Sequence, residues 1–197
     1  MRDEEIISLV LKGKTELYSD IVDKYSYKVY STAYNYTHDQ EDAKDLTQEI
    51  FIKVYNSLYG FKSKSSFSTW LYRIAVNKCI DWTRKRKIPT ISAYYDDQGE
   101  ETDIFASIPD NTYSPEEELL NAENKEIIKQ AVSELPEMYK TVLILYYFED
   151  FSPQEISDII DAPKKTVETR LFRAKNMIKS KLRDRLYGGE CYGLQQV

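Results

Sequence analysis

Apolar positions along the first third of the chain recur every three or four residues. This spacing places them on one face of a helix. Gly13 separates a short first helix, expected around residues 4–12, from a longer one that runs to about residue 36. The apolar face of the longer helix consists of Leu17 or Tyr18, Ile21, Val22, Tyr25, Val29, Ala33 and Tyr36. Strand-type alternation of useful length does not occur, so the sequence predicts an all-α fold.

Two more helices are predicted before residue 88. The stretch Thr37-His38-Asp39-Gln40 has the pattern of a capping box and precedes a helix that closes at Gly60. After a loop, residues 61–66, a helix is predicted over residues 67–87. The expected core positions of these two helices are Ala43, Leu46, Ile50, Val54 and Leu58, then Leu71, Ile74, Ala75, Cys79 and Trp82.

The next segment lacks helical periodicity and is rich in acidic residues, which is typical of a solvated linker. Ser114-Pro115-Glu116-Glu117 ends it, because serine as cap, proline at the first helical position and a glutamate after it start a helix. That helix is predicted to run to about residue 134. The expected organisation is a helical domain, residues 1–87, a flexible acidic linker, residues 88–113, a second helical domain, residues 114–187, and a tail, residues 188–197.

The second domain is predicted to contain a helix-turn-helix. A helix that starts at Pro136 ends near Glu149-Asp150, with Val142, Leu145 and Tyr146 expected in its core. Ser152-Pro153-Gln154-Glu155 is another capping box, and Asp161-Ala162-Pro163 breaks the short helix that it opens. A basic helix, residues 164 to about 182, follows this three-residue turn, which is the layout of a DNA-reading helix-turn-helix.

The basic helix has an apolar face and a polar face. Val167, Leu171, Ala174 and Ile178 are expected inside. The side chains of the polar face can bind phosphate, accept a hydrogen bond from cytosine, form hydrogen bonds with a guanine edge and contact a thymine methyl group. Its members are Lys164, Lys165, Glu168, Thr169, Phe172 and Arg173. The alternative is an ordinary solvated helix face, but the turn spacing favours DNA.

Charge is distributed in three blocks. The formal net charge of −6 argues against a protein coated in basic residues. Basic side chains nevertheless dominate residues 72–87 and 164–185, and acidic ones dominate residues 96–126 between them. This pattern places possible nucleic-acid surfaces in both predicted domains.

The helix over residues 67–87 has an unusual polar face, formed by Trp70, Arg73, Asn77, Asp81 and Arg84. Three aromatic residues, Phe67, Trp70 and Tyr72, alternate with cations and an amide beside the serine-lysine loop. Such a combination suits unstacked bases, which offer faces for stacking and free edges for hydrogen bonds. The pattern predicts single-stranded DNA binding. The alternative is that Trp70 is an ordinary partly buried aromatic.

Other chemistry is not indicated. The acidic start and the short longest apolar run, residues 142–148, predict neither a secretory signal nor a membrane span, so we expect a cytoplasmic protein. Cys79 and Cys191 suggest no disulfide framework or metal site, and His38 is most simply a surface residue at a helix start. The sequence shows no pattern of a catalytic nucleophile with its general base and no phosphate-binding loop of an enzyme, and no cofactor is expected.

Three segments resemble a known family. They are "DAKDLTQEIFIKVY" (42–55), "SSFSTWLYRIAVNKCIDWTRKR" (65–86) and "LPEMYKTVLILYYFEDFSPQEISDIIDAPKKTVETRLFRAKNMIKSKL" (135–182). In this order they are similar to the extracytoplasmic-function (ECF) group of bacterial RNA polymerase sigma factors. The resemblance runs from about Asp3 to Arg185 and implies two sigma domains that bind core RNA polymerase and promoter DNA.

The resemblance implies three sets of contact residues. The set for the clamp helices of core polymerase is Asp45, Gln48, Glu49, Ile52 and Asn56. The set for the melted non-template strand of the −10 element is Phe61, Lys62, Ser63, Lys64, Ser65, Ser66, Phe67, Trp70, Arg73, Asn77 and Arg84. The set for the duplex −35 element is Lys164, Lys165, Thr166, Glu168, Thr169, Phe172 and Arg173.

The resemblance also implies an anti-sigma factor as a partner, with no small-molecule substrate and no membrane insertion. Asp161 stands at a turn position where the family often has glycine, but aspartate tolerates the left-handed conformation. Two rival functions remain from the residues themselves. One is a stand-alone helix-turn-helix regulator that acts without polymerase, and the other is a helical protein that only sequesters a partner.

Overall fold

The computed structural model describes residues 1–86, 128 and 130–187. Every regular element in these ranges is helical, as the sequence predicted. The predicted linker, nearly all of the helix expected over residues 114–134, Cys191 and the tail lie outside the described residues. No helix in the described part of the chain is long and apolar enough to cross a membrane.

The chain divides into two compact units. The described part of the first comprises residues 1–86 and 141–168, and that of the second comprises residues 128, 130–140 and 169–187. The first unit therefore contains segments from both sides of the predicted linker. The domain boundaries predicted from the sequence stay a prediction.

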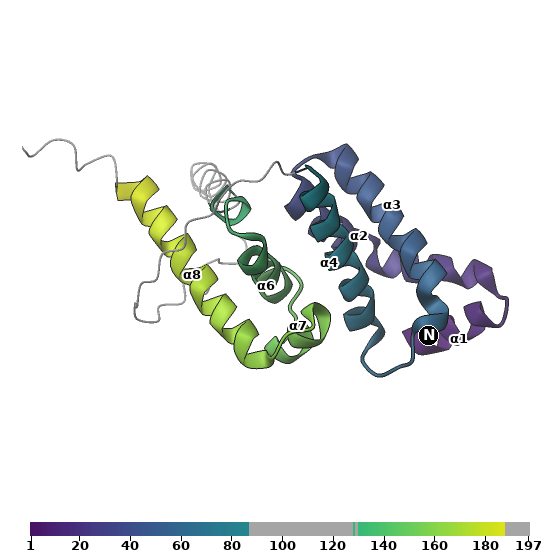
Figure 1. Ribbon diagram of the computed structural model, residues 1–197. Helices are drawn as coiled ribbons and strands as arrows, with labels where there is room; N and C mark the ends of the chain where they lie inside the picture. The colour runs from purple at the N-terminus through teal and green to yellow at the C-terminus, as the bar shows by residue number, and fades with distance from the viewer. Residues whose placement is uncertain (87–127, 129, 188–197) are drawn as a thin grey trace, which may run out of the picture. The chain divides into compact units, whose positions relative to one another are not determined.

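Four α-helices make up the N-terminal part of the first unit, and they are α1 (Asp3–Leu11), α2 (Tyr18–Thr37), α3 (Gln40–Ser57) and α4 (Phe67–Arg86). Helices α2, α3 and α4 pack pairwise, and α1 packs on α2 (Figure 1). Short 3-10 turns, η1 (Thr15–Leu17) and η2 (Leu58–Gly60), precede α2 and follow α3. The predicted apolar stripes of α2 and α3 form much of this core, although Val22 is only half-buried.

The structure corrects two details of this region. The cap of α3 is Asp39, whose side chain accepts a hydrogen bond from the Asp42 N–H, so the predicted box starting at Thr37 is wrong. His38 has φ 55° and ends α2 in the left-handed conformation, with its side chain exposed. Thr32, which the apolar pattern could not include, is completely buried on α2.

In the C-terminal half, the described residues form the helices α6 (Glu137–Tyr147), α7 (Pro153–Ile160) and α8 (Lys164–Tyr187). Helix α7 belongs to the first unit and packs on α4, whereas α6 and α8 each run through both units. Val142 and Leu145 are buried as predicted, but the expectation for Tyr146 is wrong because it is 37% exposed. Leu143 and Ile144 of α6, which the pattern did not include, are buried.

Gly13 allows the chain to turn between α1 and η1. Its φ is +100°, a conformation that side chains with a Cβ rarely adopt, and a Cβ there would meet nothing within 4 Å. We therefore expect Gly13→Ala to lower the free energy of unfolding by about 1–2 kcal/mol through backbone strain alone. Urea denaturation followed by circular dichroism measures this.

Gly60→Ala is the matched control, because Gly60 also has open space around its Cβ position but no positive φ. This variant should be neutral or slightly more stable than the wild type. Equal losses of stability in the two variants would contradict the strain argument.

Candidate nucleic-acid interface

An aromatic cluster joins the loop of residues 61–66 to the start of α4. Phe61 and Trp70 are half-buried, and Phe67, 1% exposed, lies beneath them. The ring centroids are 5.5 Å apart for Phe61 and Phe67, 5.4 Å for Phe61 and Trp70, and 5.7 Å for Phe67 and Trp70. These spacings are those of interacting rings, so the loop is fixed to the helix by packing.

Polar groups also order the loop at its junction with α4. Ser66 Oγ accepts a hydrogen bond of 3.1 Å from the Thr69 N–H, which caps one of the free amides of the first turn. Ser63 has φ 52°, a left-handed conformation that turns the loop. The remaining loop side chains are exposed, apart from the half-buried Ser65.

Part of the predicted −10 set lies on one exposed face of α4. Arg73, Asn77 and Arg84 are exposed at helical spacing, and Trp70 stands at the start of this face. Two aromatic residues do not belong to it, because Phe67 and Tyr72 are each 1% exposed. In this structure they are core residues, and Phe67 supports Phe61 and Trp70 from below.

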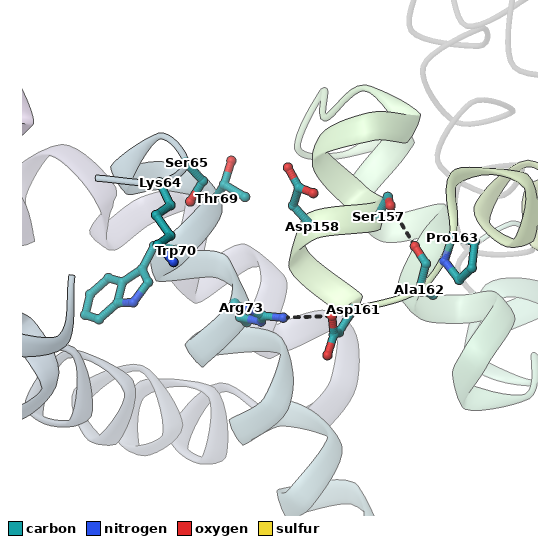
Figure 2. Close-up of a pocket in the computed structure, with 10 residues that line it drawn as sticks. All are labelled: Lys64, Ser65, Thr69, Trp70, Arg73, Ser157, Asp158, Asp161, Ala162 and Pro163. Carbon is teal, nitrogen blue, oxygen red and sulfur yellow. Dashed lines mark hydrogen bonds and ion pairs between the residues drawn. The ribbon is translucent and has the colours of Figure 1, made fainter. Parts of the chain in front are cut away.

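A pocket of about 510 Å³ lies beside Trp70, within the first unit. One wall comes from the loop and α4, and the other from α7 and the turn that follows it (Figure 2). Across it an Arg73 guanidinium nitrogen is 3.3 Å from an Asp161 carboxylate oxygen. The residues that line the pocket are Lys64, Ser65, Thr69, Trp70, Arg73, Ser157, Asp158, Asp161, Ala162 and Pro163.

The helix-turn-helix has the predicted local structure. Ser152 caps α7 in a complete capping box with Glu155, and Asp161 has φ 53° and ψ 51°, the left-handed conformation expected of it. The Ser157 hydroxyl donates a 2.6 Å hydrogen bond to the Ala162 carbonyl and closes the turn. The turn therefore fixes the direction in which α8 leaves.

The two faces of α8 are also as predicted. Val167, Leu171, Ala174 and Ile178 are buried. The polar face is exposed except for the half-buried Thr166, and Phe172 exposes 38% of its surface. Lys164 and Glu168 lie 3.8 Å apart as an exposed ion pair, which contributes little to stability and leaves both groups accessible.

All five residues of the predicted polymerase-binding set are exposed on α3. Ile52 is the apolar member and exposes 61% of its surface. Glu49 pairs with Lys78 of α4 at 3.0 Å, in an exposed contact. The set is a mixed acidic and apolar surface on a helix whose opposite side is anchored by the core.

Sequence reasoning missed a buried carboxylate. Glu149, 5% exposed, accepts a 2.7 Å hydrogen bond from the Thr32 hydroxyl of α2 and another from the Tyr72 hydroxyl of α4. Burial raises the pKa of Glu149, and burial together with the nearby carboxylate raises the pKa of Tyr72. Only the unusual position of an acid between the apolar segments 142–148 and Phe151 hinted at this site.

The raised pKa of Glu149 has a consequence for stability. A group whose folded pKa lies above its unfolded value stabilises the fold below the unfolded pKa, and this contribution is lost as the pH rises through the folded pKa. We expect the free energy of unfolding of the wild type, relative to Glu149→Gln, to fall as the pH rises from the ordinary carboxyl range. Urea denaturation at a series of pH values tests this, and a difference that does not change with pH would contradict it.

Two family models match this chain. Residues 21–88 match sigma-70 region 2, which covers the loop and α4, and residues 125–178 match sigma-70 region 4, which covers the helix-turn-helix. The ECF RNA polymerase sigma factor SigW of Bacillus subtilis is 36% identical over 182 residues, covering 90% of this chain and 95% of the relative. The chain belongs to the ECF sigma factor family. This confirms the resemblance and the fold class predicted from the sequence.

Other relatives of this ECF sigma factor match over similar lengths. The sigma-E factor of Haemophilus influenzae is 33% identical, covering 92% of this chain and 96% of the relative, and the sigma-H factor of Pseudomonas aeruginosa is 32% identical, covering 92% and 94%. Among solved structures, CnrH in complex with the cytosolic domain of CnrY has a TM-score of 0.66 at 19% identity over 91% of this chain and 96% of that chain. The sigma factor RpoE in complex with the anti-sigma factor NepR from Bartonella quintana has 0.60 at 18% identity over 84% and 96%. These two show the same fold.

Proposed function

We propose that this ECF sigma factor binds core RNA polymerase, directs it to promoters with −35 and −10 elements, and helps to open the −10 region. The observation that carries this proposal is the exposed face of α4. It combines a half-buried tryptophan, fixed by ring packing to an ordered serine-lysine loop, with exposed cations and an amide. This composition fits a strand whose bases have left the duplex.

The −10 contacts are assigned to two groups of residues. Lys62, Ser63, Lys64, Ser65 and Ser66, with Phe61, form the loop that would receive an unstacked base. Trp70, Arg73, Asn77 and Arg84 would hold the strand along α4. Phe67 acts through Phe61 and Trp70, because its own ring is buried.

The −35 contacts are assigned to α8. Recognition helices enter the major groove with the residues near their N-terminus, which is where the exposed set from Lys164 to Arg173 begins. Lys164 and Lys165 would neutralise phosphates, whereas Glu168 and Arg173 have the chemistry to read base edges.

We assign the binding of core polymerase to the exposed surface of α3. Asp45, Gln48, Glu49, Ile52 and Asn56 share one side of this helix and are not used by the core of the unit. A stand-alone regulator would have no use for this surface or for the α4 face. We further propose that the chain acts in the cytoplasm as an initiation factor without catalytic activity of its own, and that an anti-sigma factor is a partner.

Run-off transcription with purified bacterial core polymerase tests this function. Promoter fragments selected from genomic DNA serve as templates, and wild type is compared with Arg173→Ala and Lys179→Ala. Both substitutions remove one cation from an exposed position of α8, but only Arg173 belongs to the −35 set. We expect wild type to direct initiation from discrete sites. Arg173→Ala should reduce this initiation roughly 10- to 100-fold, whereas Lys179→Ala should leave it nearly unchanged.

The rival function predicts a different outcome. If core polymerase never initiates while the protein alone protects a duplex site, the chain is a stand-alone regulator. In that case the surfaces of α3 and α4 serve another partner.

A further inference from the structure

A single acidic residue interrupts the basic part of α8. Glu168 is the only aspartate or glutamate between Lys164 and Arg183, a stretch that is otherwise rich in lysine and arginine. Its side chain is 54% exposed, on the part of the helix that carries the −35 set. DNA is a polyanion, so a carboxylate on this surface is repelled unless the DNA offers it a hydrogen-bond donor.

Helix stability does not account for Glu168. An acid stabilises a helix most in its first turn, beside the positive end of the helix dipole. Glu168 lies beyond the first turn of α8, and that turn contains no acid. The ion pair of Glu168 with Lys164, 3.8 Å long, has both side chains exposed and the lysine on the N-terminal side, which is the weaker order.

The two lysines at the start of α8 indicate that this end of the helix meets an anion. Lys164 and Lys165 occupy the first turn, where positive charges face the positive end of the helix dipole. This arrangement is unfavourable in the free protein and becomes favourable beside phosphate groups. Glu168 lies one helical turn further along, where a recognition helix places side chains against base edges.

The chemistry of the base edges selects one base for a carboxylate. In the major groove cytosine presents the N4 amino group, which is a donor. Guanine and thymine present oxygen or nitrogen acceptors there, and adenine places the N7 acceptor beside its N6 donor. A carboxylate only accepts hydrogen bonds, so it is attracted to cytosine and repelled by the acceptors of the other bases. Attraction to one base and repulsion from the others both add to specificity.

We propose that Glu168 selects a C·G base pair in the −35 element by accepting a hydrogen bond from the N4 amino group of cytosine. The proposal rests on the proposed function for the DNA element that α8 meets. It divides the labour on this helix, because Lys164 and Lys165 supply affinity that does not depend on sequence, whereas Glu168 determines which base pair is accepted.

Glu168→Gln is the decisive variant. Glutamine has nearly the same size, but its amide both donates and accepts, which matches the N6 and N7 groups of adenine. Glu168→Ala removes the carboxylate and offers no replacement. Glu41→Gln is the matched control, because Glu41 also forms an exposed ion pair near the start of a helix, with Lys44 at 2.7 Å, and belongs to none of the three contact sets.

The base preference is measured with the full chain bound to core polymerase. The −35 region of a selected promoter is randomised, and the bound duplexes are recovered and sequenced. Wild type and Glu41→Gln should enrich C·G at one position, where Glu168→Gln should enrich A·T and Glu168→Ala should accept all four base pairs. Competition between two duplexes that differ only there should favour C·G roughly 10- to 100-fold in wild type and A·T in Glu168→Gln.

Lys165→Gln shows what the loss of a phosphate contact looks like. This variant should weaken binding to all duplexes about equally and leave the preference for C·G unchanged. The slope of the logarithm of affinity against the logarithm of salt concentration should fall by about 1, because one fewer phosphate is neutralised.

Two results overturn the proposal. One is a preference at that position that is the same in wild type, Glu168→Gln and Glu168→Ala. The other is a change spread over several positions in both variants, which would mean that Glu168 acts through the geometry of α8. Failure of the proposed function looks different, since the protein alone would then select duplex sites while core polymerase never initiates. The same comparison of variants on those sites still decides whether Glu168 reads cytosine.

Discussion

Replacing Ile52 by glutamate is expected to weaken binding to core RNA polymerase by at least about 30-fold, which corresponds to roughly 2 kcal/mol. Ile52 exposes 61% of an apolar side chain in the middle of an otherwise polar set on α3. Such a residue gains most from burial at an interface, and a charge there would be desolvated without a partner. The new carboxylate at position 52 would also lie one helical turn from Glu49, so the partner would face two like charges.

The equilibrium is measured by titrating fluorescently labelled protein with core polymerase. Tyr27→Glu is the control, because Tyr27 is 82% exposed on α2 and the substitution introduces the same charge away from the α3 set. Both variants should keep the melting temperature of the wild type within a few degrees, since neither position belongs to the core. If the two variants bind polymerase equally well, α3 is not the docking surface.

Local signals in the sequence predicted the helices that carry the candidate site. Helix α4 was expected over residues 67–87 and ends at Arg86, and the capping box at Ser152 starts α7 as predicted. These features depend on residues within one turn of each other, so they can be read without knowledge of the tertiary structure. Asp39 was missed as the cap of α3 because Thr37 offered an overlapping pattern two residues earlier.

Long-range packing accounts for what the sequence could not show. Helix α4 has aromatic residues on more than one side, and only the fold determines that Phe67 and Tyr72 are buried while Trp70 stays at the edge. The hydrogen bonds of Glu149 span 117 and 77 residues, to Thr32 and Tyr72. No periodic pattern connects positions at such separations, and a buried acid contradicts the local expectation that charges face water.

The same edge position of Trp70 leads to the second prediction. Trp70→Ala is expected to reduce opening of the −10 region by roughly 10- to 100-fold, because stacking of a base on an aromatic side chain contributes about 1–3 kcal/mol. Binding to the closed duplex should change little, since the −35 set on α8 is untouched. Permanganate reactivity of thymines in the −10 region measures opening, and protection of the −35 region measures closed binding.

Trp82→Ala separates stacking from packing. Trp82 is a half-buried tryptophan on the same helix, with the Arg86 guanidinium 4.4 Å from its ring centre, but it does not belong to the −10 set. Alanine at either position removes an indole from α4, and melting temperatures show how much each loss affects the fold. Opening that fails only in Trp70→Ala identifies Trp70 as a DNA contact. If both variants open the promoter in proportion to their stability, Trp70 acts through the ring cluster with Phe61 and Phe67, and the melted strand is held by the polar residues of α4.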